Sequence, residues 1–180
     1  MPLATQGEMP YSVMDAKVYS YSGGVAGTAK DMPGIRRVEM ESNIEETEHR
    51  GDNGILAVAA SFNSVDLTIE LGQLNLDAIA ALSGGFVDTA ATTPNQIRTL
   101  TRKSTDNLAD YQIKAKTNSR TVDGGATWVV FPRCQWVGGP NYSMEDNEFP
   151  VIEVTCRAVP AADDVIYQIQ QYENATTAIT

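Results

Sequence analysis

One stretch of strict two-residue alternation, residues 37–45, limits the folds open to this chain more than any other feature. Apolar side chains occupy one parity, with Ser42 as its one polar member, and charged or amide side chains occupy the other. The polar parity includes Glu39, Glu41, Asn43 and Glu45. Alternation with a period of two predicts a long β-strand with one packed face and one polar, mostly acidic face.

The chain after this stretch predicts the second strand of a hairpin. Residues 55–60 form an apolar run, and the residues before it tolerate the positive φ that a tight turn requires. These turn residues are Gly51, Asp52, Asn53 and Gly54. We therefore expect a long hairpin over residues 35–61.

Most of the remaining chain also predicts β-structure. Strand-like runs cover residues 13–21, 65–71, 97–103, 111–116, 127–137, 152–158 and 165–170. Residues 22–34 are rich in Gly and Ala and predict a loop, while residues 1–12 and 173–180 predict terminal arms. A single short helix is expected at about 75–83, because Asn75 can cap its start and Gly84 can end it.

Length and composition fit a single domain over residues 1–180. A hydrophobic content of 42% and a charged content of 20% are typical of a globular chain that can bury its own core. The fold class predicted is mainly β, an antiparallel sandwich or barrel-forming sheet with one short flanking helix. Cys134 and Cys156 both lie in strand-like runs and are expected to be small buried side chains.

The net charge of −10 argues against a surface that binds nucleic-acid phosphates. It leaves open a surface past which nucleic acid slides without binding. The apolar runs are too short to span a membrane, and the first ten residues lack the pattern of a cleaved leader, so we expect no membrane contact.

Catalytic and metal-binding motifs are weak throughout. His49 is the only histidine, and no serine lies in a nucleophile elbow, so we expect no enzyme and no catalytic residues. The carboxylates around His49 and in 145–148 lack the spacing of zinc or calcium ligands, and no phosphate-binding glycine loop precedes a helix. We expect no metal and no cofactor. The Arg50-Gly51-Asp52 triplet is explained by the turn rather than by adhesion.

The order of elements resembles the major tail tube protein of long-tailed bacteriophages of the siphophage type. The stretches that carry the resemblance are IRRVEMESNIEETEHRGDNGILAVA, VDLTIELGQLNLDAIAALSGG and CQWVGGPNYSMEDNEFPVIEVTCRAVP, within residues 11–172. The family implies a structural virion protein that assembles into hexameric rings, stacked into a hollow tube through which the genome passes. It also implies tape-measure and tail terminator proteins as partners, and a location in the tail, after assembly in the host cytoplasm.

The resemblance implies roles for several residues. The lumen would be lined by 35–46, 55–61 and parts of 133–139 and 149–158, with Glu39, Glu41, Asn43 and Glu45 facing it. An acidic lining repels phosphate, so DNA would pass without specific binding. The loop 22–34 would join successive rings through Lys30, Asp31, Met32 and Pro33.

Three other hypotheses stay open from the sequence. The first is a monomeric β-sandwich that binds a carbohydrate or receptor, with the acidic strand face simply solvated. The second is another virion component, such as a capsid decoration protein. The third is an unrecognised hydrolase, which would need an activated nucleophile near His49.

Overall fold

The computed structural model describes residues 10–51, 54–119, 125–138, 140–143, 146, 151–172 and 179, and it is mostly β-structure. The elements are β1 Pro10–Ser22, β2 Val25–Asp31, β3 Ile35–Gly51, β4 Gly54–Leu71, α1 Leu76–Ser83, β5 Phe86–Ala90, β6 Ile97–Thr101, β7 Tyr111–Ser119, β8 Ala126–Trp136, β9 Asn141–Ser143, β10 Val151–Ala158 and β11 Gln168–Tyr172. Residues 10–12 of the expected N-terminal arm belong to β1. The rest of that arm and nearly all of the tail 173–180 lie outside the described residues.

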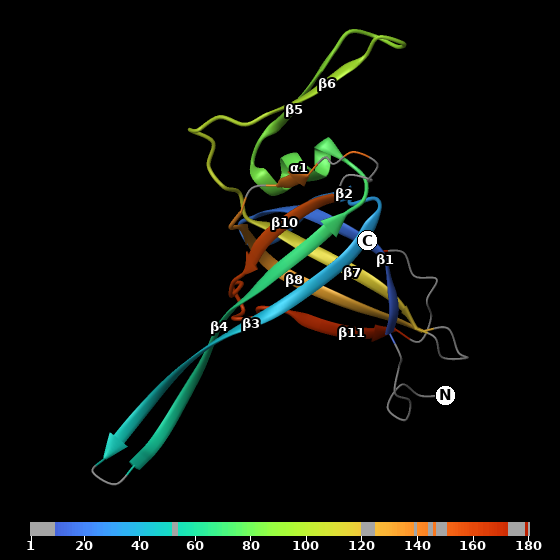
Figure 1. Cartoon of the computed structure of the whole chain (residues 1–180). Coiled ribbons are helices and arrows are strands. Elements are labelled where there is room, and N and C mark those ends of the chain that lie inside the picture. Colours follow the sequence, from blue (N-terminus) through green and yellow to red (C-terminus); the bar gives the residue numbers. More distant parts are fainter. Residues whose placement is uncertain are drawn as a thin grey trace.

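Most strands belong to one antiparallel sheet in the order β2-β1-β7-β8-β10-β4-β3, with β11 paired to β8 and β9 to β10. β1 contacts β3 although four strands lie between them in the sheet, so the sheet curls round on itself (Figure 1). β5 and β6 form a separate two-stranded sheet beside the helix. The predicted mainly-β, antiparallel, sandwich-like fold with one short helix is confirmed.

The core fills the concave side of this curled sheet. In β4, Val65, Leu67 and Ile69 are fully buried, and the residues between them point away from the core. β10 repeats the pattern from Ile152 to Ala158. Each buried Leu or Ile side chain stabilises the fold by roughly 1.5–3 kcal/mol relative to exposure, so these two strands and β7 supply much of the driving force for folding.

The two cysteines lie in this core, as the sequence predicts. Cys134 and Cys156 are buried free thiols on the neighbouring strands β8 and β10. Burial raises the pKa of the Cys156 thiol to about 12 and raises the pKa of Cys134 well above its ordinary value. Both groups therefore stay protonated near neutral pH and act as small apolar side chains.

The helix α1 begins and ends at the predicted residues. The Asn75 side chain accepts hydrogen bonds from the backbone N–H groups of Asp77 and Ala78, and Gly84 ends the helix with φ 74°. Ile79 and Leu82 face the core. The helix thus covers one open end of the curled sheet (Figure 1).

Two expectations about local structure are wrong. Residues 22–34 do not form a loop, because Val25–Asp31 is the edge strand β2. Both faces of β2 are exposed, so its sequence lacks the alternation that marks a half-buried strand. The runs 55–60 and 65–71 are not separate strands but parts of the continuous strand β4, so the hairpin extends over 35–71 rather than 35–61.

Candidate functional site

The outer side of β10, β4 and β3 carries a charged surface opposite the core. Residues paired directly across an antiparallel ladder share a face. Asp66 pairs with both Glu41 and Arg157, Thr68 pairs with Glu39 and Thr155, and Glu70 pairs with Arg37 and Glu153. We call this surface the acidic face; its charged members are Arg37, Glu39, Glu41, Asp66, Glu70, Glu153 and Arg157. Five carboxylates against two guanidinium groups give it a net charge of −3.

Ion pairs order part of the acidic face. Arg157 binds Asp66 through two hydrogen bonds, Nε to Oδ1 at 2.6 Å and Nη2 to Oδ2 at 3.0 Å. Asn43 donates to the same carboxylate at 2.9 Å, and the Arg157 bond is the main cause that lowers the pKa of Asp66. Arg37 bridges Glu39 at 2.6 Å and Glu70 at 3.3 Å. Among the described residues Glu41 has no ion-pair partner, so its charge remains uncompensated.

The four residues singled out from the sequence lie on one side of β3, the side of the acidic face. Glu39 and Glu41 face outward within the body of the sheet, and Glu45 lies farther along, where it accepts a hydrogen bond from Asn63 at 3.2 Å. Asn43 is half-buried and bonded to Ser64 and Asp66, so it organises the surface rather than presenting a free group. The outward-facing members of residues 66–70 were not expected on the acidic face, although the alternation of that stretch could have indicated their position.

The outer half of the β3–β4 hairpin leaves the body of the protein and projects away from it (Figure 1). A β-bulge marks the boundary: Asn43 pairs with Ser64, but Ile44 pairs with Phe62, which leaves Asn63 as an extra residue in β4. Beyond it, Ile44, Phe62 and Val58 continue the core-side face with exposed fractions of 57%, 42% and 56%. We call this surface the hairpin strip.

The hairpin strip corrects the expected packing of this strand. The apolar parity of residues 37–45 was predicted to be packed, and Val38 does contact the core. Met40 and Ile44, however, are 42% and 57% exposed, because β3 is an edge strand and the body ends beneath it. The strand 55–61, which the resemblance implies as part of the lumen lining, belongs to the projecting half of the hairpin.

The hairpin end is described only in part. Gly51 pairs with Gly54, while Asp52 and Asn53 lie outside the described residues. His49 is exposed and pairs with Ala57. In the described part of the chain no three His, Cys, Asp or Glu side chains come together as a metal site would require.

The predicted ring-joining residues divide into two groups. Lys30 and Asp31 are exposed in β2, and Pro33 is half-buried just after it. Met32 is only 1% exposed and belongs to the core, where its backbone N–H donates to the Ala16 carbonyl at 3.0 Å. Met32 therefore cannot be a surface contact.

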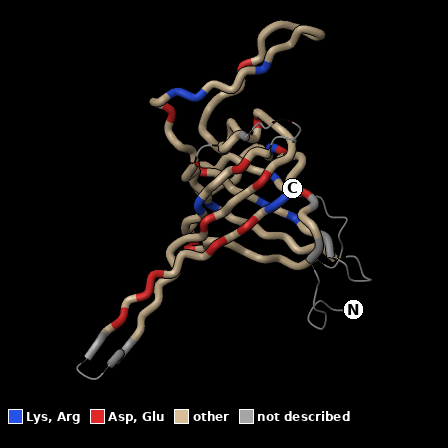
Figure 2. Tube along the Cα trace, viewed as in Figure 1, with Lys and Arg blue, Asp and Glu red and all other residues tan. Residues whose placement is uncertain are grey.

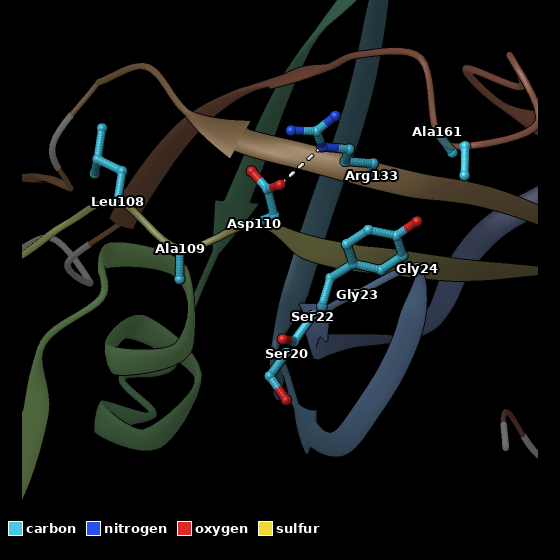
Figure 3. A pocket seen from close by; sticks show the side chains of 11 residues that line it. Ser20, Ser22, Gly23, Gly24, Leu108, Ala109, Asp110, Arg133 and Ala161 are labelled. Carbon is cyan, nitrogen blue, oxygen red and sulfur yellow. Dashed lines mark hydrogen bonds and ion pairs between the residues drawn. The ribbon is translucent and has the colours of Figure 1, made fainter.

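An open groove of about 760 Å³ lies between the β1–β2 turn and the segments around residues 108–110 and 161–162 (Figure 3). Its one ion pair among the described residues joins Asp110 to Arg133 at 2.8 Å, and Gln135 donates to the other carboxylate oxygen at 2.9 Å. Asp110 is thus held by two partners from β8, and the remaining wall is mainly Gly, Ala and Ser. The arrangement ties a loop to the sheet and offers no acid–base pair.

Comparison with known proteins does not assign the chain. No family model matches it, and no curated protein matches it. Within the described residues no helix has the length and apolar character needed to cross a membrane. The features on which a functional proposal can be based are therefore the acidic face, the open edges β2 and β3, and the hairpin strip.

Proposed function

We propose that this chain is a structural virion protein, the subunit of a phage tail tube built from stacked hexameric rings. The observation that supports the proposal is a sheet with an acidic outer face and open edges at both ends, β2 and β3. Unpaired strand edges are a template for further pairing, and a closed ring of sheets removes them. Copies joined edge to edge would place the same face of each copy toward a common lumen.

The charge of the acidic face fits a passage for DNA. A lining that repeats a net −3 per copy repels phosphate, so DNA slides through without being held. Glu41 and Glu153 contribute most directly, because no described residue forms an ion pair with either of them. Arg37 and Arg157 hold their carboxylate neighbours in place, which keeps the lining rigid.

The proposal includes partners and a location. Lys30, Asp31 and Pro33 remain candidates for contacts between rings, tape-measure and tail terminator proteins would meet the tube inside and at its end, and the protein would reside in the virion tail after assembly in the host cytoplasm. Its role is structural, not catalytic. A monomeric binding module would leave the β3 edge and the hairpin strip in water, and a capsid decoration protein would not need a lumen.

Electron microscopy and sedimentation velocity of the purified full chain, over a range of concentration and salt, test the assembly directly. Rings or tubes of constant width support the proposal. A monomer under every condition contradicts it and favours the binding module.

The lumen charge has its own test. Replacing Glu39, Glu41 and Glu45 with Lys should make assembled tubes retain double-stranded DNA, with an affinity that falls steeply as salt increases. In the matched control variant, Asp146, Asp163 and Asp164 are replaced with Lys. These three residues are exposed outside the acidic face. Equal DNA retention by the two triple variants would show that the acidic face is not the lining.

A further inference from the structure

The β5–β6 hairpin has an exposed face that carries two large apolar side chains. Phe86 and Ile97 share this face through the pairs Phe86–Thr101 and Ala90–Ile97, and their exposed fractions are 50% and 62%. The opposite face carries Val87 and Leu100, which are half-buried, and contacts α1. We call the face with Phe86 and Ile97 the outward face.

Contacts with the helix fix the position of this hairpin. Arg98 binds Asp77 of α1 at 2.7 Å, and Leu100 packs against the core. The outward face is therefore held in position by the body although it is itself uncovered. A two-stranded sheet is marginally stable in water, so an uncovered apolar face on it calls for a partner.

One basic side chain, that of Lys103, borders the outward face, and a second follows β6 in the chain. The Lys103 ammonium lies 5.9 Å from the centre of the Phe86 ring, and the neighbouring Arg102 is exposed. Asp88, which pairs with Thr99, lies on the outward face between Phe86 and Ala90; it is the one acidic residue within 86–103, against three basic residues. Arg98 is already paired with Asp77, which leaves Arg102 and Lys103 as the cations available to a partner.

The hairpin strip has the complementary character. Glu46 pairs with Ala60 and Glu48 with Val58, so these two carboxylates lie on the same side of the hairpin as Ile44, Val58 and Phe62. The strip is thus apolar with acidic side chains, whereas the outward face combines Phe86 and Ile97 with a single carboxylate, Asp88, and has Lys103 at its border. Two copies of the strip placed against each other would bring glutamates together, which disfavours a symmetric contact between strips.

The two surfaces lie at opposite ends of the molecule. The β3–β4 hairpin projects from one end and the β5–β6 hairpin from the other (Figure 1). Acidic positions follow the first, while the second carries both basic and acidic positions (Figure 2). Complementary surfaces at opposite ends produce head-to-tail contacts, which extend as a chain of copies unless a rotation closes them.

We propose that the hairpin strip of one copy packs on the outward face of the β5–β6 hairpin of the next copy along the assembly. Ile44, Val58 and Phe62 cover Phe86 and Ile97, and Glu46 and Glu48 meet Arg102 and Lys103. The partner is a second copy of this chain. The inference rests on the proposed self-assembly and assigns the surfaces that join copies along its axis.

Charge reversal on each side, followed by reversal on both, tests the contact. Glu46→Lys with Glu48→Lys, or Arg102→Glu with Lys103→Glu, should weaken association along the axis by about tenfold or more. The fourfold variant should recover most of it. Sedimentation velocity and tube length measure the effect, far-UV circular dichroism verifies folding, and Asp163→Lys is the control for a remote charge change.

A cysteine pair provides a second measurement that does not depend on charge. An equimolar mixture of Val58→Cys and Ile97→Cys proteins, treated with a mild disulfide-forming oxidant, should yield crosslinked dimers. The control mixture pairs Ile97→Cys with Ser61→Cys, because Ser61 is exposed on the other side of the same hairpin and should crosslink far less.

The outcomes separate the inference from the function on which it rests. If the wild-type chain never assembles, the proposed function fails and the inference fails with it. If the wild type assembles but neither charge reversal weakens it, or if both cysteine mixtures crosslink equally, only the hairpin contact is overturned. Loss in each twofold variant with recovery in the fourfold variant establishes it.

Discussion

The two halves of the β3–β4 hairpin share one hydrogen-bond ladder but differ in what lies beneath it. In the inner half, Val65, Leu67 and Ile69 are fully buried against the curled sheet. In the outer half, Ile44 and Val58 on the same side are more than half exposed. Backbone pairing is therefore similar along the hairpin, while burial of apolar area, the main source of stability, is confined to the inner half.

This difference teaches that strand length and strand stability are separate properties. A two-stranded ribbon is marginal in water on its own. The outer half therefore depends on the inner half for its position and, in our proposal, on a neighbouring copy for its burial. The bulge at Asn63 marks the point at which the hairpin leaves the body.

Hydrogen exchange should show the largest contrast between the halves. Ladder amides of residues 65–71 should exchange only through global unfolding, whereas those of 58–61 should exchange through local fraying. Because such opening free energies range from near zero to the global value, the rates in the monomer should differ by roughly a thousandfold or more. Mass spectrometry of exchanged peptides measures this, and equal protection in both halves of the monomer would contradict the comparison.

Truncation of a side chain in each half should give the next largest difference. Leu67→Ala should lower the free energy of unfolding by about 2–5 kcal/mol, since it opens a cavity among fully buried neighbours. Val58→Ala should change the stability of the monomer by less than about 0.5 kcal/mol, because the side chain is more than half exposed. Urea denaturation curves of the two variants provide the comparison.

Much of this fold could be predicted from the sequence, because a strand with one buried face has alternating apolar and polar residues. The alternation in 65–71 and 152–158 identifies strands with one face in the core, and Asn75 with Gly84 brackets the helix. The charged side of residues 37–45 was likewise assigned correctly. β2 was missed because both its faces are exposed, and an exposed edge strand has no reason to alternate.

The surfaces between copies could not be predicted in the same way. Met40 and Ile44 look like core residues by parity, and only the extent of the body beneath β3 shows that they are uncovered. Met32 looked like a loop residue, yet it fills the core beside Ala16 and Val18. The outward face of β5–β6 depends on a register and on contacts with α1 that no local pattern specifies.

Phe62 lies at the boundary between the two halves and should show an intermediate effect. Its ring meets that of Tyr167 edge to face, with centroids 6.2 Å apart, and Tyr167 packs against the core. Phe62→Ala should therefore lower monomer stability by about 0.5–1.5 kcal/mol. Ile44→Ala should have a smaller effect, because the Ile44 side chain is more than half exposed. Thermal unfolding of both variants, alone and combined with Tyr167→Leu, tests whether the aromatic contact is responsible.

The smallest expected effect concerns the acidic face, through Asp66 and pH. The bond from Arg157 lowers the pKa of Asp66 below its ordinary value of 3.8 in the folded protein. A carboxyl whose folded pKa is depressed stabilises the fold fully above the unfolded pKa, and it loses that contribution as pH falls through the folded pKa. Both side chains are partly solvated, with exposed fractions of 31% for Asp66 and 44% for Arg157, so screening limits the effect to at most about 1 kcal/mol. Asp66→Asn should consequently be less stable than the wild type at pH 7, and the gap should close as pH falls below 3.8 in urea titrations at matched ionic strength. A gap that persists undiminished well below that value would assign the role of Asp66 to packing and neutral hydrogen bonding with Asn43 rather than to its charge.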